Sequence, residues 1–138
     1  MYSREQLQGI LLTVARPELT IYPSQANDVG YIIRLRVMFR ASMDFINALD
    51  RTFEQYNIVS NIKEIEGSNR KKPVLVVGRR LSIKNIVNLM PNVPTSHADW
   101  TVFNEVLSRM DEGKHLEQEG MDEIFLLVKG NGENSSDE

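Results

Sequence analysis

Residues 31–40 alternate between apolar and mostly polar side chains, and this period of two is typical of a β-strand that is buried on one face. The odd positions are all apolar, whereas the even positions include three arginines. A strand of this kind belongs in an antiparallel sheet whose one face packs on a core while the other is open. The arginines on the predicted open face are Arg34, Arg36 and Arg40.

The rest of the sequence predicts an α+β domain. Ser3, Ser42, Ser82 and Asp99 are N-cap residues in front of helical apolar patterns, and Gly113 ends the helix that follows Asp99. This order of elements gives a four-stranded antiparallel sheet with helices on one face. The expected helices cover residues 4–15, 43–57, 83–90, 100–112 and 117–129, and the expected strands cover 18–24, 31–40, 58–66 and 73–80.

A length of 138 residues with 41% hydrophobic side chains fits one compact domain. We expect this domain to span residues 1–129, because residues 130–138 contain no apolar side chain and predict a disordered acidic tail. The sequence has neither a membrane-spanning apolar run nor a secretory pattern. A cytoplasmic location without a membrane partner is therefore expected.

Several classes of site are excluded by composition and spacing. The sequence has no cysteine, which rules out disulfides, thiolate zinc sites and cysteine nucleophiles. His97 and His115 lie too far apart in the sequence for metal-ligand spacing. No phosphate-binding glycine loop or serine-nucleophile motif occurs. We therefore expect no cofactor, no metal, no catalytic residue and no small-molecule substrate.

Charge is distributed unevenly along the chain. Residues 34–84 carry a net charge of +6, residues 85–138 carry −8 and residues 1–33 carry −1. The basic segment is a candidate anion-binding surface, and the alternative is a solvated basic face without a partner. Arginine favours nucleic acid, because a guanidinium group pairs in a bidentate manner with guanine or phosphate. The expected DNA-binding residues are Arg34, Arg36, Arg40, Thr20, Tyr22, Lys63, Arg70, Lys71, Lys72, Arg79 and Arg80.

Three ordered stretches resemble the LAGLIDADG homing endonuclease family. The first is LQGILLTVARPELTIY, in which Gly9 takes the position of the family's helix-packing glycine. The second is YIIRLRVMFRASMDFINALDRTF, and the third runs from LSIKNIVNLMP to DWTVFNEVLSRMDEGKHLEQEGMDEIFLLV. Together they cover about residues 5–129. The resemblance implies an αββαββα unit whose sheet lies in the major groove of DNA.

The resemblance also implies a dimer. The chain carries one copy of the motif, and the motif helices of the family pack against each other between two subunits or between two halves of one chain. The predicted helix 4–15 is apolar on almost every side, which is typical of a helix buried from two directions. The expected homodimer interface consists of Leu7, Gly9, Ile10, Leu11, Thr13 and Val14.

The sequence departs from the family at its catalytic positions. The metal-binding acid of the motif falls on Val14 and an earlier acid falls on Leu12, and neither side chain can bind a divalent cation. The nearest carboxylates are Glu5, at the far end of the helix, and Glu18, beyond the proline that ends it. The family's basic residue near the metal site is also missing, because PTSHADW offers only His97.

We therefore expect a homodimeric, sequence-specific binder of double-stranded DNA that does not cut it, with transcriptional regulation or interference as its role. Three alternatives stay open. One is an active homing endonuclease in which Glu18 replaces the missing metal ligand. The others are an RNA-binding maturase and a protein-binding module that uses the acidic C-terminal half.

Overall fold

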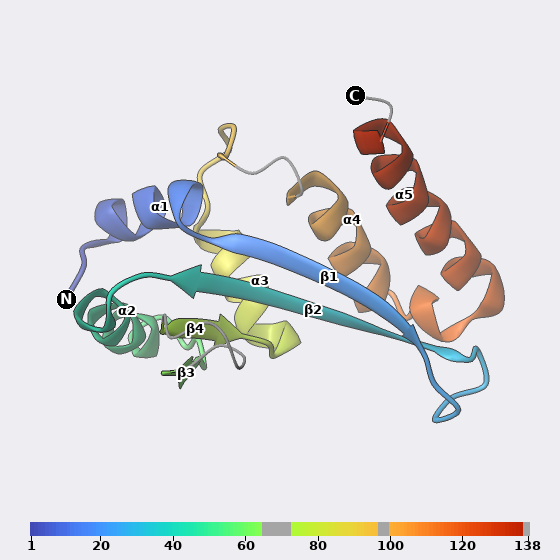
Figure 1. Ribbon diagram of the computed structural model, residues 1–138, viewed down its shortest axis with the longest axis horizontal. Coiled ribbons are helices and arrows are strands. Elements are labelled where there is room, and N and C mark those ends of the chain that lie inside the picture. Colours follow the sequence, from blue (N-terminus) through green and yellow to red (C-terminus); the bar gives the residue numbers. More distant parts are fainter. Residues whose placement is uncertain (65–72, 97–99, 137–138) are drawn as a thin grey trace. The chain divides into compact units, whose positions relative to one another are not determined.

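A computed structural model of the protein describes residues 1–64, 73–96 and 100–136, with side chains as far as residue 130. The four strands form one sheet in the order β1-β2-β4-β3, and the predicted α+β class with an antiparallel sheet is confirmed (Figure 1). The elements are α1 (Arg4–Thr13), β1 (Arg16–Pro23), β2 (Tyr31–Arg40), α2 (Met43–Glu54), β3 (Asn61–Lys63), β4 (Val74–Val77), α3 (Arg80–Leu89), α4 (Trp100–Asp111), the 3-10 helix η1 (Lys114–Leu116) and α5 (Gln118–Ser136).

The chain forms two compact units. The first consists of Met1–Glu18 and Leu35–Ala98, and it holds α1, α2, α3, β3, β4 and the second half of β2. The second consists of Leu19–Arg34 and Asp99–Glu138, and it holds the turn of the β1–β2 hairpin with α4, η1 and α5. Within the described residues, no helix is long and apolar enough to cross a lipid bilayer.

The core of the first unit lies between the odd-numbered face of β2 and the helices. In the β2–β4 register Val37 faces Val77 and Phe39 faces Leu75, so these four buried side chains share one face of the sheet. The ring of Phe53, from α2, meets the ring of Phe39 edge-on at 5.4 Å between centroids. This contact confirms that the apolar row of β2 lies on the helix side of the sheet.

The opposite face of the sheet is less open than the alternation alone predicts. Met38, Val74 and Val76 form a small apolar cluster on this face and are only 5%, 0% and 7% exposed. Arg40 covers part of the cluster, since its Nη2 lies 3.8 Å from the sulfur of Met38. This face therefore carries charged side chains on β2 and, where β2 pairs with β4, the buried apolar cluster of Met38, Val74 and Val76.

The ends of α1 and α2 follow the predicted capping chemistry, but that of α3 does not. Ser3 forms a capping box with Gln6, and the Ser42 hydroxyl accepts the N–H of Phe45 at 3.4 Å. Helix α3 begins earlier than predicted, after Arg79, which makes no side-chain capping bond. Ser82 is therefore not an N-cap, and it lies buried inside the helix.

The second unit builds its hairpin around Asn27 and Gly30. The Asn27 side chain accepts the N–H of Gly30 at 2.8 Å and donates to the Tyr31 carbonyl at 2.8 Å. Gly30 has a φ of +87°, a conformation that favours glycine. At the start of β2 the ring of Tyr31 meets Phe125 of α5 edge-on at 4.8 Å. Helix α5 thus packs on the odd-numbered face of this hairpin.

The helices of the second unit meet at a tight corner. Gly113 ends α4 with a φ of +76°, as predicted, and η1 follows. At Gly120 a Cβ would lie 2.1 Å from the carbonyl oxygen of Lys114, so only glycine allows this approach. The final helix extends past residue 129, where the sequence predicted its end, and residues 137–138 lie outside the described part.

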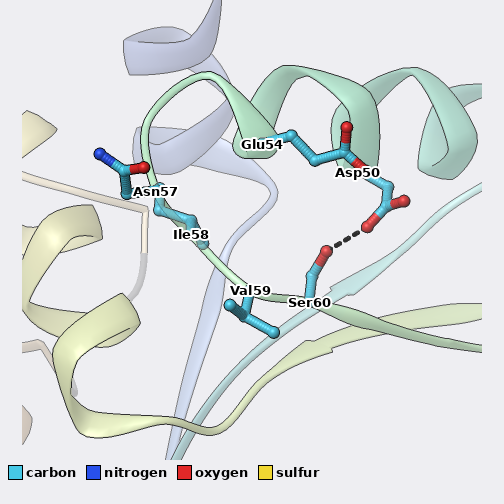
Figure 2. A pocket seen from close by; sticks show the side chains of 6 residues that line it. All are labelled: Asp50, Glu54, Asn57, Ile58, Val59 and Ser60. Carbon is cyan, nitrogen blue, oxygen red and sulfur yellow. Dashed lines mark hydrogen bonds between the residues drawn. The ribbon is translucent and has the colours of Figure 1, made fainter.

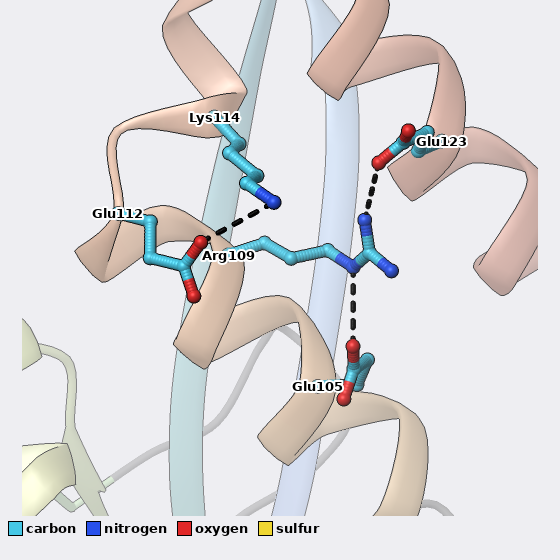
Figure 3. A network of polar contacts seen from close by, with 5 residues as sticks. All are labelled: Glu105, Arg109, Glu112, Lys114 and Glu123. Atoms are coloured by element: carbon cyan, nitrogen blue, oxygen red, sulfur yellow. Dashed lines mark hydrogen bonds and ion pairs between the residues drawn. The ribbon is translucent and has the colours of Figure 1, made fainter.

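Acidic side chains of the second unit form ion pairs with two of its basic residues, Arg109 and Lys114 (Figure 3). Arg109 of α4 binds Glu105 at 3.2 Å and Glu123 of α5 at 2.5 Å. Lys114 binds Glu112 at 3.3 Å. The Arg109 pairs therefore join α4 to α5, which gives part of the acidic C-terminal half a structural role within its own unit.

Candidate nucleic-acid interface

A row of charged side chains crosses the first unit on the face opposite the helices. The register aligns Arg40 of β2 with Val74 of β4, and Val74 with Lys63 of β3. Residues directly paired in a sheet project on the same side, so Arg40 and Lys63 lie on one face with Val74 between them. Lys63 is exposed and Arg40 is half-buried. The structure thus brings together two cations that are 23 positions apart in the sequence.

Arg36 lies two positions before Met38 on the same face, and it is paired. Its Nη2 donates to a carboxylate oxygen of Glu18 on β1. The Arg36 side chain is 24% exposed and that of Glu18 is 37% exposed. The Nε of Arg36 is buried and has no hydrogen-bond partner in the part of the chain that the structure describes. Arg36 is therefore held in place by its neighbours, unlike a mobile surface arginine.

The hairpin of the second unit carries the other predicted strand residues. Its turn is closed by the N–H of Ser24, which donates to the Gly30 carbonyl at 2.9 Å. Thr20, Tyr22 and Arg34 are all exposed, and Tyr22 is 37% exposed. Strand alternation places Thr20 and Tyr22 on one face of β1 and Arg34 on the face of β2 opposite its apolar row. These three side chains are accessible to a ligand.

The remaining predicted basic residues fall into two groups. Arg79 and Arg80 are exposed at the start of α3, directly after β4. The predicted residues Arg70, Lys71 and Lys72 lie outside the described residues, as does His97. Contact of Arg70, Lys71 and Lys72 with DNA stays a prediction.

Helix α1 presents two different faces. Leu7 and Leu11 are fully buried in the core of their own unit, so they offer no surface to a second subunit, contrary to the predicted interface. Gly9 and Thr13, one turn apart, are exposed, and Ile10 is half-buried. A Cβ added at Gly9 would meet nothing within 4 Å. Together with Val14, which is half-buried, these residues leave a shallow face of small and apolar groups open to solvent.

Sequence reasoning did not identify a surface hollow of about 460 Å³ beside the end of α2 (Figure 2). In it the Ser60 hydroxyl donates to the carboxylate of Asp50, and Glu54 lies one turn further along the helix. Within the described residues, no group of three His, Cys, Asp or Glu side chains is placed to hold a metal ion. The residues that line the hollow are Asp50, Glu54, Asn57, Ile58, Val59 and Ser60.

Comparison with solved structures identifies the architecture. The homing endonuclease I-TnaI matches with a TM-score of 0.74 and 16% identity over 91% of this chain and 85% of its own. The LAGLIDADG meganuclease I-CpaMI, bound to uncleaved DNA, matches with a TM-score of 0.75 and 16% identity. The I-LtrWI LAGLIDADG homing endonuclease, bound to target DNA, gives 0.75 and 18%. This is the LAGLIDADG homing endonuclease fold.

The likeness is one of fold, since no family model and no curated protein matches the sequence. The chain aligns with 92% of its length to I-CpaMI and 91% to I-LtrWI, but it spans only 43% of each of those chains. It therefore corresponds to most of I-TnaI and to slightly less than half of the two DNA-bound enzymes.

The foot of α1 does not fit the divalent metal that the LAGLIDADG resemblance implies there. Val14, the C-cap residue of the helix, has no oxygen ligand in its side chain, and neither has Leu12. Ser96 hydrogen-bonds to two backbone carbonyls at the C-terminal end of α1. Its N–H donates to the Leu12 carbonyl at 2.9 Å, and its hydroxyl donates to the Thr13 carbonyl at 3.1 Å. Glu18, the possible substitute, is bound to Arg36. The C-terminal end of α1 is thus hydrogen-bonded within the protein and, among the described residues, presents no carboxylate that could bind a divalent cation.

Proposed function

We propose that this protein binds double-stranded DNA in a sequence-specific manner, acts as a homodimer and does not cut its target. The observation that carries the proposal is the helix-free sheet face, where Arg36, Arg40 and Lys63 lie together in the first unit. A two-stranded β-ribbon fits the major groove of B-DNA, and arginine is the side chain best suited to read guanine there. Such a binder would suit transcriptional regulation or interference.

Two neighbours of the fold support DNA as the ligand. I-CpaMI and I-LtrWI were both crystallised with DNA, and this chain aligns with about half of each. The exposed hairpin residues Thr20, Tyr22 and Arg34 add polar and cationic groups of the kinds that contact bases and phosphates. The acidic half is a weaker candidate surface, because Arg109 and Lys114 already engage several of its carboxylates.

The chemistry at the foot of α1 supports binding without cleavage. Metal-assisted phosphodiester hydrolysis requires carboxylates that coordinate hard cations close to the scissile phosphate. Val14 and Leu12 provide none, and the Glu18 carboxylate is engaged by Arg36. A metal ligand at Glu18 would have to give up this ion pair, which leaves the half-buried guanidinium without its carboxylate.

The exposed face of α1 supports the dimer. Gly9 and Thr13 lie one turn apart and are exposed, and a Cβ at Gly9 would meet nothing within 4 Å, so a second backbone can approach closely. The Thr13 hydroxyl already donates to the Gly9 carbonyl at 2.7 Å, so this face carries no unsatisfied hydroxyl group. The interface that we propose therefore uses Gly9, Ile10, Thr13 and Val14, without the buried leucines.

Selection of bound duplexes from a random DNA library tests the proposal. The expected result is a bipartite target with two related half-sites, bound far more tightly than scrambled duplex or structured RNA at the same salt concentration. Preferential binding of structured RNA would favour the maturase alternative instead. Failure to enrich any duplex would contradict DNA recognition by this face.

A further inference from the structure

The Glu18–Arg36 ion pair joins two neighbouring strands on the face proposed to bind DNA. Both residues belong to the first unit, and the contact is made between the Glu18 carboxylate and Nη2 of Arg36. An acid on a surface that should attract phosphates is unexpected, because it lowers the local positive potential. The pair therefore needs an explanation other than attraction to the DNA backbone.

The surroundings of Arg36 differ from those of Arg34 on the same face of β2. Arg34 is exposed, and within the described residues it makes no ion pair. Arg36 is 24% exposed, its Nε is buried, and a carboxylate holds one end of its guanidinium group. These contacts restrict the rotamers of Arg36, so less conformational entropy is lost when it forms further hydrogen bonds.

We propose that Arg36 reads a guanine base and that Glu18 is the residue that positions it; this inference rests on the proposed DNA binding. Nη2 carries two N–H groups, so the bond to Glu18 leaves one of them free beside those of Nη1. Two adjacent N–H donors match the O6 and N7 acceptors of guanine in the major groove. The negative charge of Glu18 disfavours an alternative phosphate contact by Arg36.

This arrangement gives Arg36 and Lys63 different roles in DNA binding. Arg36 contributes base discrimination at one position of each half-site, because its donors are fixed in direction. The exposed Lys63 is a flexible point charge and contributes affinity that does not depend on sequence. Loss of the Glu18 carboxylate should therefore lower specificity while it raises general affinity for DNA.

The test compares the parent protein with Glu18→Gln in library selection and in titrations against selected and scrambled duplexes. We expect preference for guanine at one position of each half-site to fall about tenfold in Glu18→Gln. Affinity for scrambled duplex should rise, with a salt slope steeper by about one unit per subunit. Glu54→Gln, an exposed residue of α2, removes the same charge and should leave the base preference unchanged.

A double-mutant cycle distinguishes positioning from an effect on overall structure. If Glu18 acts through Arg36, adding Glu18→Gln to Arg36→Ala should not change base preference further. Glu18→Asp keeps the charge but shortens the side chain, and we expect an intermediate preference with an unchanged melting temperature. If the Gln and Asp variants both keep the parent's preference, the positioning role is wrong while DNA binding stands. A parent protein that selects no duplex would overturn both proposals.

Discussion

The hydroxyl oxygen of Ser82 accepts the backbone N–H of Val59 at 2.9 Å and so connects α3 to the segment that leads into β3. Ser82 is 3% exposed and is one of two buried polar side chains among the described residues. A buried polar group requires a partner, because water cannot replace the lost hydrogen bond. The bond therefore joins two points of the chain that are 23 positions apart in the sequence.

Replacing Ser82 by alanine should lower the free energy of unfolding by about 1–2 kcal/mol, because the N–H of Val59 then loses its acceptor. Ser108→Ala, at an exposed position of α4, is the matched control and should change stability by less than about 0.5 kcal/mol. Urea unfolding followed by circular dichroism measures both variants. An equal stability for the two would show that Val59 finds another partner.

Features set by local chemistry were predicted well. The bounds of β2 agree with its alternation, Ser3 and Ser42 cap their helices, and Gly113 ends α4. These features depend on a few consecutive residues, whose periodicity and capping preferences are visible in the sequence. Ser82 shows the limit, because a serine before an apolar stripe looks the same whether it caps a helix or binds a distant backbone group.

Features that depend on pairing between distant segments were not predicted. The burial of Met38 results from its position beside Val76 across the β2–β4 ladder, which no single-strand pattern contains. The Glu18–Arg36 pair likewise depends on the register of β1 against β2. The full burial of Leu7 and Leu11 assigns them to the core side of α1 and leaves Gly9 and Thr13 exposed on the other side, a division that composition alone did not give. In each case tertiary packing decides which of two plausible faces is covered.

Substituting Gly9 by leucine should dissociate the proposed dimer and leave the monomer folded. Nothing lies within 4 Å of a Cβ at this position, so the new side chain projects into solvent in the monomer. Replacing glycine in a helix also removes a propensity cost of about 1 kcal/mol, so the melting temperature of the monomer should not fall. Light scattering at micromolar concentration, with circular dichroism as the folding control, measures the effect. A monomeric parent protein under these conditions would contradict the homodimer.

Both strands of the selected duplex should stay intact when the protein is incubated with Mg²⁺ or Mn²⁺. The physical reason is the lack of carboxylates at Leu12 and Val14 and the engagement of Glu18 by Arg36. Denaturing gel electrophoresis of end-labelled strands detects single nicks. Metal-dependent nicking that is lost in Glu18→Gln would establish the displaced-ligand nuclease instead, and this variant is the required control for contaminating activity.

Two substitutions on the sheet should weaken DNA binding in different ways. Lys63→Ala should reduce affinity for all duplexes alike and lower the salt slope by about one unit per subunit, because a phosphate contact is lost. Arg34→Ala should cost about 1–3 kcal/mol of binding free energy on the selected duplex and relax the base preference at one position of each half-site if its exposed guanidinium reads a base.

The matched control is Arg51→Ala, which removes the same charge from α2 and should leave both the affinity and the base preference close to those of the parent. Titrations at several salt concentrations separate the two effects, because sequence-independent contacts change the slope whereas base contacts change the ratio between duplexes. If Arg51→Ala weakens binding as much as the two sheet variants do, the decrease reflects net charge alone and the helix-free face is not the DNA-binding surface.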